Sequence, residues 1–154
     1  PDFICIVPEK RKEITTEGGL NIKKHQSKIK KIISKLKAQK IRVSLFIEPN
    51  IKDIEISKNI DADCIEIHTG KICKLYHKKK KIKTELKKIK DAVNYANSIG
   101  LEVHAGHGIT YSSARILSKV KGIKEFNIGH FLIGESIFKG IKACIKEFKK
   151  ILSK

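Results

Sequence analysis

The 154-residue sequence has no methionine, no tryptophan, only three prolines and only four cysteines. No apolar run approaches the roughly 20 residues that a membrane-spanning helix needs, which argues against an integral membrane protein. The cysteines form no Cys-x-x-Cys pair and have no histidine at zinc-finger spacing, so we expect no metal site built on them. Isolated cysteines in apolar segments are typical of reduced core thiols, and we therefore expect a cytoplasmic protein.

Negative charge is scarce relative to positive charge. The 34 lysines and arginines outnumber the 16 aspartates and glutamates, which gives a net charge of +18. Arginine and aromatic residues, which read and stack nucleic-acid bases, are few. The lysines recur instead at helical spacing between apolar residues, as in residues 28–33, so we interpret them as solvated helix faces. A basic nucleic-acid-associated protein is the less favoured alternative, with Lys78–Lys81 as its best contact.

Strand-like and helix-like segments alternate along the whole chain. The expected strands are residues 3–8, 41–47, 64–68, 101–105 and 125–129. The expected helices are residues 22–39, 51–60, about 79–98, 111–119 and about 135–152. This alternation predicts an α/β fold with a parallel sheet. Because no linker or change of composition interrupts it, we expect a single domain over residues 1–154.

Two segments near the C-terminal end carry the strongest functional signal. Val103–Thr110 and Asn127–Gly134 each contain a Gly-His pair where a strand is expected to end. Glycine lets a ligand approach the backbone closely, and backbone N–H groups at the end of a parallel strand favour anions. We therefore expect a phosphorylated small molecule at this edge of the sheet, with the histidines as candidates for proton transfer.

Other polar side chains are expected at the same edge. Glu66 and His68 are two residues apart on a strand, so they share one face of the sheet. For His68, a hydrogen bond within the core and a role in the site are both open, and it is not counted among the candidates. His104 and His107 lack a third ligand nearby in the sequence, so we expect no metal there.

Five segments, taken in order, resemble the pyridoxine 5′-phosphate synthase family. They are Val7–Leu20, Val43–Ile47, Ile65–Gly70, Ala105–Gly108 and Asn127–His130. The resemblance implies a (β/α)8 TIM barrel, of which this chain would hold the last five βα units while the first three are absent. Because five strands cannot close such a barrel, and because the sequence has no initiator methionine, we expect the C-terminal part of a longer enzyme that is inactive alone.

The resemblance also implies a reaction and a set of site residues. The family condenses 3-amino-2-oxopropyl phosphate with 1-deoxy-D-xylulose 5-phosphate to give pyridoxine 5′-phosphate, phosphate and water, with no cofactor. His107 matches the proton donor, and Glu66 matches a carboxylate near the reacting centre that assists proton transfer. The residues that match substrate contacts are Thr15 for deoxyxylulose phosphate, and Gly108, Gly129 and His130 for the other phosphate.

The sequence also leads to expectations about assembly, and it differs from the family pattern at one position. The resemblance implies a homo-oligomer such as an octamer, without nucleic-acid or membrane partners. Where relatives tend to carry arginine, this chain has Glu135, which we expect to point outward from the first turn of the last helix. Another phosphate-binding barrel enzyme with a different substrate is the main alternative function.

Overall fold

The computed structural model describes residues 1–8 and 18–153. Five strands lie in these ranges: β1 (Phe3–Ile6), β2 (Arg42–Ile47), β3 (Cys64–His68), β4 (Glu102–Gly106) and β5 (Ile123–Asn127). The helices are α1 (Ile22–Ala38), α2 (Ile51–Asn59), α3 (Gly70–His77), α4 (Lys83–Ser98), α5 (Tyr111–Leu117), α6 (His130–Lys139) and α7 (Ile141–Leu152). Strands and helices alternate as the sequence predicts.

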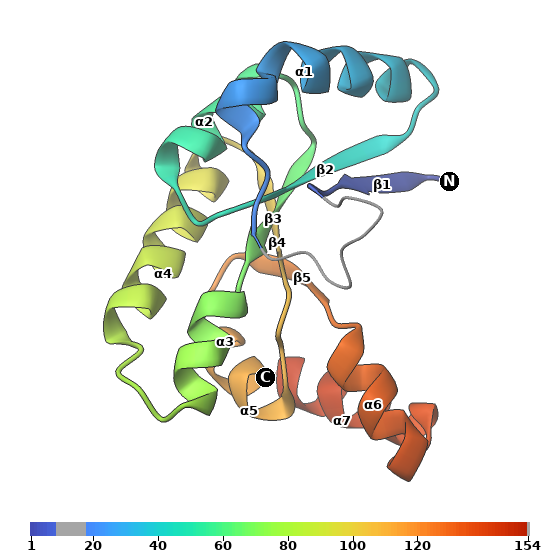
Figure 1. Ribbon diagram of the computed structural model, residues 1–154. Helices are drawn as coiled ribbons and strands as arrows, with labels where there is room; N and C mark the ends of the chain where they lie inside the picture. Colours follow the sequence, from blue (N-terminus) through green and yellow to red (C-terminus); the bar gives the residue numbers. More distant parts are fainter. Residues whose placement is uncertain (9–17, 154) are drawn as a thin grey trace.

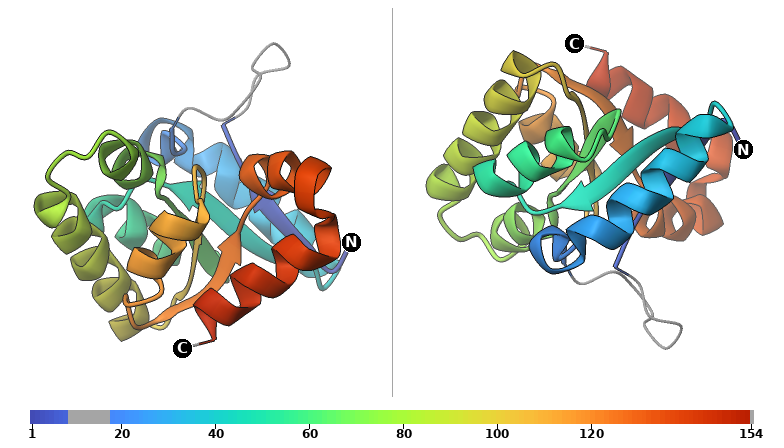
Figure 2. Two further views of the ribbon diagram at one scale, coloured as in Figure 1. Left: turned by 90° about the horizontal axis from the view of Figure 1, so that it is seen from below. Right: turned by 90° about the horizontal axis from the view of Figure 1, so that it is seen from above.

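The five strands form one parallel sheet in the order of the chain, β1-β2-β3-β4-β5. The helices lie in an arc around one face of this sheet, as Figures 1 and 2 show. Alternate strand residues face the helices and are apolar and fully buried, among them Leu45, Ile65 and Val103. The hydrophobic core therefore lies between the sheet and the helices, and the carboxyl ends of all strands meet at one edge.

The opposite face of the sheet is polar. Phe46, Glu66 and His104 are paired across β2, β3 and β4, and side chains at alternate positions share this inner face. Cys5 and Cys64 also lie there, beside charged groups, whereas the sequence places both in apolar surroundings. The face that would line a barrel interior is thus built from titratable groups.

Three helix boundaries differ from the sequence-based expectation. The helix α3 follows β3 directly, in a segment left unassigned, and the basic helix begins at Lys83 instead of residue 79. The last helix is two helices, because Gly140 has φ +77° and ψ 142°, a conformation essentially reserved for glycine. Glu135 consequently lies in the second turn of α6, where it forms an ion pair with Lys139 at 2.8 Å.

The helix surfaces bear on two further expectations. In the described ranges, none of the helices combines the length and the apolar character needed to cross a membrane. Exposed lysines lie on α1, α4 and α7, which occupy different sides of the molecule in Figure 1. Lysines spread over several helices in this way are typical of solvated helix faces.

Candidate active site at the carboxyl ends of the strands

His107 follows β4 directly and adopts a backbone conformation that is rare outside glycine. Its φ is +76°, and the next residue, Gly108, has φ +73°. A left-handed conformation at a histidine costs free energy and is maintained only where the surroundings enforce it. Thr69, fully buried after β3, enforces it here: its hydroxyl lies 2.7 Å from the carbonyl oxygen of Gly106 and 2.8 Å from that of His107.

Glu66 lies on β3 with its carboxylate at the same end of the inner face. Its Oε2 accepts hydrogen bonds from Asn127 Nδ2 at 2.7 Å and from the thiol of Cys5 at 3.5 Å. Its Oε1 occupies the space beside the Cα of Gly106, where a Cβ atom would overlap it. Three strands, β1, β3 and β5, therefore converge on one carboxylate, immediately below the loop that carries His107.

The environment of Glu66 favours its protonated form. Burial raises the pKa of this carboxyl group above its usual range, and the hydrogen bonds from Asn127 and Cys5 oppose the rise only in part. The pKa of the neighbouring Cys5 thiol is also raised, to about 12, by burial and by the charge of Glu66. A carboxyl group with a raised pKa is suited to proton transfer near neutral pH, whereas the Cys5 thiol stays protonated.

The second Gly-His pair lies at the same edge of the sheet. Gly129 lies between β5 and α6, His130 is the first residue of α6, and both are exposed. Gly129 precedes the first turn of α6, a helix of ten residues whose leading backbone N–H groups suit an anion. Among residues 1–8 and 18–153, no atom lies within 4 Å of the position of a Cβ at Gly129, so these residues leave the approach open. Thr15 lies outside the described residues.

In the loop after β4, the backbone N–H groups at the start of α5 are not available to bind an anion. Thr110 and Ser113 cap α5 reciprocally: the Ser113 hydroxyl accepts from the Thr110 N–H at 2.8 Å, and Thr110 Oγ1 accepts from the Ser113 N–H. These amides are therefore already satisfied within α5. An anion near Gly108 would be bound by the tight left-handed turn that His107 and Gly108 form.

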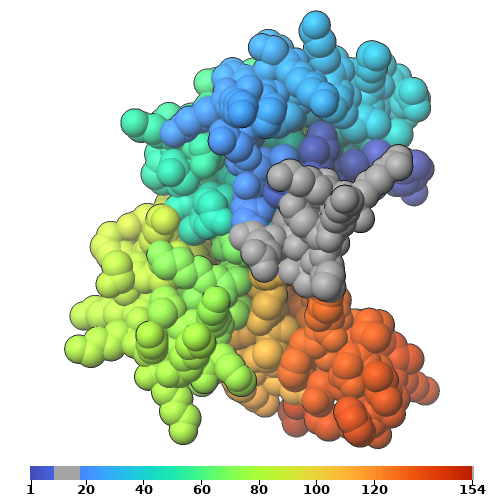
Figure 3. All heavy atoms as spheres, viewed as in Figure 1, coloured from blue at the N-terminus to red at the C-terminus, as the bar shows by residue number. Residues whose placement is uncertain are grey.

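A cavity of about 1400 Å³ opens beside this loop. Gly70, His107 and Gly108 line one wall, and the segment between α3 and α4 lines the other. The lysines that line the cavity on this segment and on the adjoining ends of α3 and α4 are Lys74, Lys79, Lys80, Lys81 and Lys83. In Figure 3 this yellow-green segment stands out from the surface of the molecule. A wall of this charge favours anionic ligands next to His107.

Sequence reasoning left out one pair of residues that the structure places at this edge. His68, the last residue of β3, has its Nδ1 2.7 Å from Oε1 of Glu48, and its ring centroid lies 4.8 Å from that of His107. Glu48 follows β2 and also accepts from the backbone N–H of Gly19 at 3.1 Å. The position of both residues directly at strand ends was the available signal, because such ends meet at one edge.

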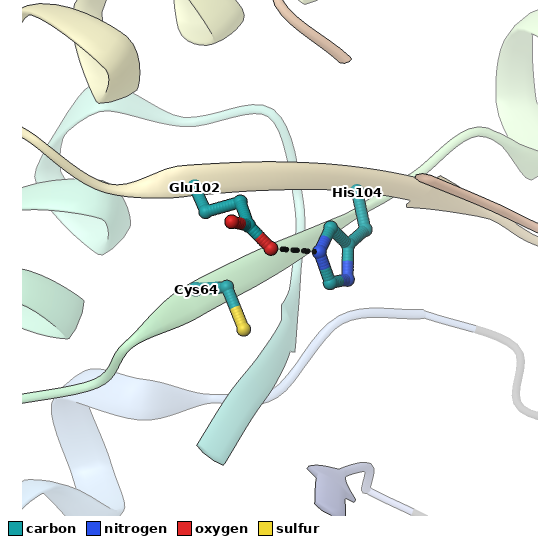
Figure 4. Close-up of side chains that lie close together, drawn as sticks. All are labelled: Cys64, Glu102 and His104. Atoms are coloured by element: carbon teal, nitrogen blue, oxygen red, sulfur yellow. Dashed lines mark hydrogen bonds and ion pairs between the residues drawn. The ribbon is translucent and has the colours of Figure 1, made fainter. Parts of the chain in front are cut away.

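A second polar cluster lies lower on the inner face, toward the amino ends of the strands. Cys64, Glu102 and His104 offer ligand atoms within 4.8 Å of one another, and Figure 4 shows Glu102 and His104 of β4 beside Cys64 of β3. Two observations argue against a metal ion at this cluster. Arg42 donates a hydrogen bond to Glu102 Oε1 at 3.0 Å, and burial raises the pKa of Cys64 to about 11, which disfavours the thiolate form that binds metals. With His104 Nε2 also 2.8 Å from Glu102, the carboxylate is already neutralised by protein groups.

Comparison with known proteins identifies the family. All of residues 1–154 match the family described as pyridoxal phosphate biosynthesis protein PdxJ. The chain belongs to this family. It is 56% identical over 154 residues to the pyridoxine 5′-phosphate synthase of Pelagibacter ubique, covering 100% of this chain and 64% of that relative. It is 44% identical over 152 residues to the pyridoxine 5′-phosphate synthase of a Sulfurihydrogenibium species, covering 99% of this chain and 62% of that relative.

The PdxJ chain described here thus spans slightly less than two thirds of the length of these relatives. Among solved structures, it is similar to the tryptophan synthase A-subunit of Pyrococcus furiosus, with a TM-score of 0.59 and 16% sequence identity. The match covers 99% of this chain and 56% of that subunit, which is a TIM barrel. The similarity therefore confirms the predicted α/β fold of the TIM-barrel type, and it concerns the fold alone.

Proposed function

We propose that this chain is the C-terminal part of a pyridoxine 5′-phosphate synthase, made of the last five βα units of one barrel domain. The reaction would join 3-amino-2-oxopropyl phosphate to 1-deoxy-D-xylulose 5-phosphate by general acid–base catalysis, without a metal or cofactor. The observation that supports the proposal is that His107 follows β4 directly and His130 begins the helix after β5, with Glu66 on β3 beside Gly106, in a chain of the PdxJ family. The names of the relatives supply the substrate class.

The roles follow from the chemistry of each group. His107 gives protons to departing oxygen atoms, since an imidazole is an effective proton donor near neutral pH. Glu66, with its raised pKa, assists proton transfer at the ring being built. Gly108, Gly129 and His130 hold the phosphate of the amino ketone, and Thr15 contacts the sugar phosphate. The basic wall of the cavity beside His107 supports anionic substrates over neutral ones.

The decisive experiment assembles a complete barrel. The part of the Pelagibacter ubique relative outside the match is joined to the start of this chain, and the product is assayed for pyridoxine 5′-phosphate and released phosphate. Turnover that requires both phosphorylated substrates supports the proposal. A folded assembly that binds neither substrate overturns it, and activity with other phosphorylated substrates supports the alternative of a different phosphate-binding barrel enzyme.

Localisation and assembly belong to the same proposal. Because the four cysteines are free thiols, three of them buried, we place the enzyme in the cytoplasm. We further propose a homo-oligomer, with an octamer as the form implied by family resemblance. Ile137 and Phe138 support association, since their side chains leave an apolar strip on α6 with 77% and 87% of each residue exposed.

A further inference from the structure

His68 is held in place more firmly than a residue at the end of a strand requires. Its Nδ1 lies 2.7 Å from Glu48 Oε1, and its ring meets that of Phe46 in an edge-on contact with centroids 5.3 Å apart. The side chain is only 10% exposed. The imidazole is therefore fixed in position and in rotation by a carboxylate on one side and an aromatic ring on the other.

The other nitrogen of this ring is buried and unsatisfied. His68 Nε2 has no hydrogen-bond partner in the described part of the chain. Leaving a buried polar atom unpaired costs free energy, so such an atom in a native structure calls for an explanation. The acceptor Glu48 accounts for which nitrogen carries the proton: a neutral His68 donates from Nδ1 to the carboxylate, which leaves a lone pair on Nε2.

The Nε2 edge of His68 and the ring of His107 lie beside the same glycine. A Cβ at Gly70 would lie 2.7 Å from His68 Nε2 and 2.6 Å from His107 Cδ2, so the edges of both rings converge above this glycine. The two rings are tilted by 60° with centroids 4.8 Å apart. Gly70 and His107 line the cavity described above, which gives this meeting point access to a bound substrate. Any side chain at Gly70 would displace one ring.

We propose that His68 is a proton-relay residue that recharges His107 between the steps of the reaction. Once His107 has given its proton to a departing oxygen, the imidazolium of His68 passes a proton from Nε2 to His107, directly or through one water. His68 is then neutral, and when the substrate next releases a proton to His107, His107 returns a proton to Nε2 of His68. The inference rests on the proposed function, in which His107 is the proton donor; because His68 acts through His107, it is a positioning residue.

The charges around the pair favour this role. The hydrogen bond from His68 holds the pKa of Glu48 below its usual range, against the opposing effect of burial, so the carboxylate is ionised when the imidazolium forms. Lys88 and Lys71 also act on Glu48 electrostatically, from α4 and α3. On the other side, His107 is the titratable group in ring contact with His68. Two imidazoles this close repel when both are charged, which favours sharing of one proton.

Two variants separate the relay from a structural role. In His68→Asn, the side-chain amide occupies the place of Nδ1 and still donates to Glu48, but nothing replaces Nε2. Glu48→Gln keeps an oxygen acceptor and removes the charge. His25→Asn, on the exposed face of α1, is the matched control. All three are made in the assembled barrel and compared by thermal unfolding, by substrate binding and by kcat.

For His68→Asn we expect an unfolding temperature and substrate KM close to those of the parent, with kcat reduced at least about 10-fold, yet by less than the roughly 10²–10⁴-fold that loss of a direct proton donor causes. Glu48→Gln should lower kcat in the same sense. Parent-like kcat in folded His68→Asn overturns the inference. A proportional loss of kcat and folded fraction also overturns it, since that result reveals only a structural role.

A measurement independent of turnover keeps the inference separate from the proposed function. With ¹⁵N-labelled histidine, neutral His68 should show a protonated Nδ1 and an unprotonated Nε2, and the signals of His107 should move in His68→Asn but not in His25→Asn. Should the assembled barrel lack synthase activity while these signals behave as stated, the proposed function fails and the coupling of the two imidazoles stands. Unchanged His107 signals in His68→Asn overturn the relay.

Discussion

The carboxylate of Glu66 fills the space in which a side chain at Gly106 would begin. This relationship links two neighbouring strands, β3 and β4, directly beneath His107. The glycine is required by the close approach of the Glu66 carboxyl group, since a Cβ at this position would overlap Oε1 and come within 3.3 Å of Asn127 Cβ. The carboxylate, its amide partner and the glycine therefore form one unit, whose parts come from β3, β5 and β4.

Gly106→Ala should consequently disrupt this unit. We expect loss of stability of about 1–3 kcal/mol, the usual cost of overpacking, because the hydrogen bond between Asn127 and Glu66 must break to make room. Gly134→Ala is the matched control, since no atom of the described residues lies within 4 Å of its Cβ position and alanine favours the helix by up to about 1 kcal/mol. Thermal unfolding of both variants in the assembled barrel checks the pair; equal unfolding temperatures would contradict the steric argument.

Glu66 should also make stability depend on pH in a defined sense. Because its pKa is raised in the folded state, the folded protein holds this proton more tightly than the unfolded chain does. Between the unfolded pKa near 4.5 and the higher folded pKa, the free energy of unfolding therefore falls as pH rises. Glu66→Gln cannot ionise and therefore does not lose stability as pH rises. The unfolding temperature of the variant minus that of the parent should consequently be larger at pH 8 than at pH 4.

Glu55→Gln, which changes a carboxylate on the exposed face of α2, serves as the control for that series. Its unfolding temperature should follow that of the parent at every pH. If Glu66→Gln follows the parent in the same way, the carboxyl group of Glu66 is not destabilised by burial, and its assignment to proton transfer near neutral pH loses its physical basis.

His107→Gln should lower kcat by roughly 10²–10⁴-fold in the assembled barrel, the range expected when a general acid is removed. Glutamine keeps a polar group near the position of Nε2, and Thr69 still binds the backbone carbonyl oxygens of residues 106 and 107, so substrate KM should change little. Steady-state kinetics measure kcat and KM separately and so check this prediction, with His25→Gln as the control. A KM effect without a kcat effect would assign His107 to binding instead.

The sheet was accessible from the sequence because its signals are local. Apolar residues at alternate positions, as in Ile65 and Ile67, mark a strand that buries one face, and glycine or proline marks where such strands end. The edge that carries His107 and His130 followed from the same pattern, since parallel strands align their carboxyl ends. The family resemblance then added roles to residues that the pattern had already placed.

The features of the site that the sequence did not predict depend on contacts between distant segments of the chain. The hydrogen bond between Asn127 and Glu66 joins residues 61 positions apart, and the sequence around either residue does not predict it. His68 was ambiguous because its partner Glu48 belongs to another loop. The helix α3 was missed for a different reason: it is short and begins at Gly70, a poor helix former, and tertiary packing of Ile72 and Cys73 stabilises it. Thr69 occupies its N-cap position but makes no capping hydrogen bond with its side chain.

The phosphate site that we propose before α6 can be tested with a variant for which stability and substrate binding should respond in opposite directions. In Gly129→Asp, a carboxylate enters open space at the N-terminus of a helix, where negative charge is favoured, so the unfolding temperature should hold or rise. The same charge repels a phosphate at this position, so KM for the amino ketone phosphate should rise at least about 10-fold, equivalent to about 1.4 kcal/mol. Gly129→Asn, which has the same shape without the charge, should keep KM within a few-fold of the parent. If the two variants raise KM equally, then size rather than charge matters there, and Gly129 does not adjoin the phosphate.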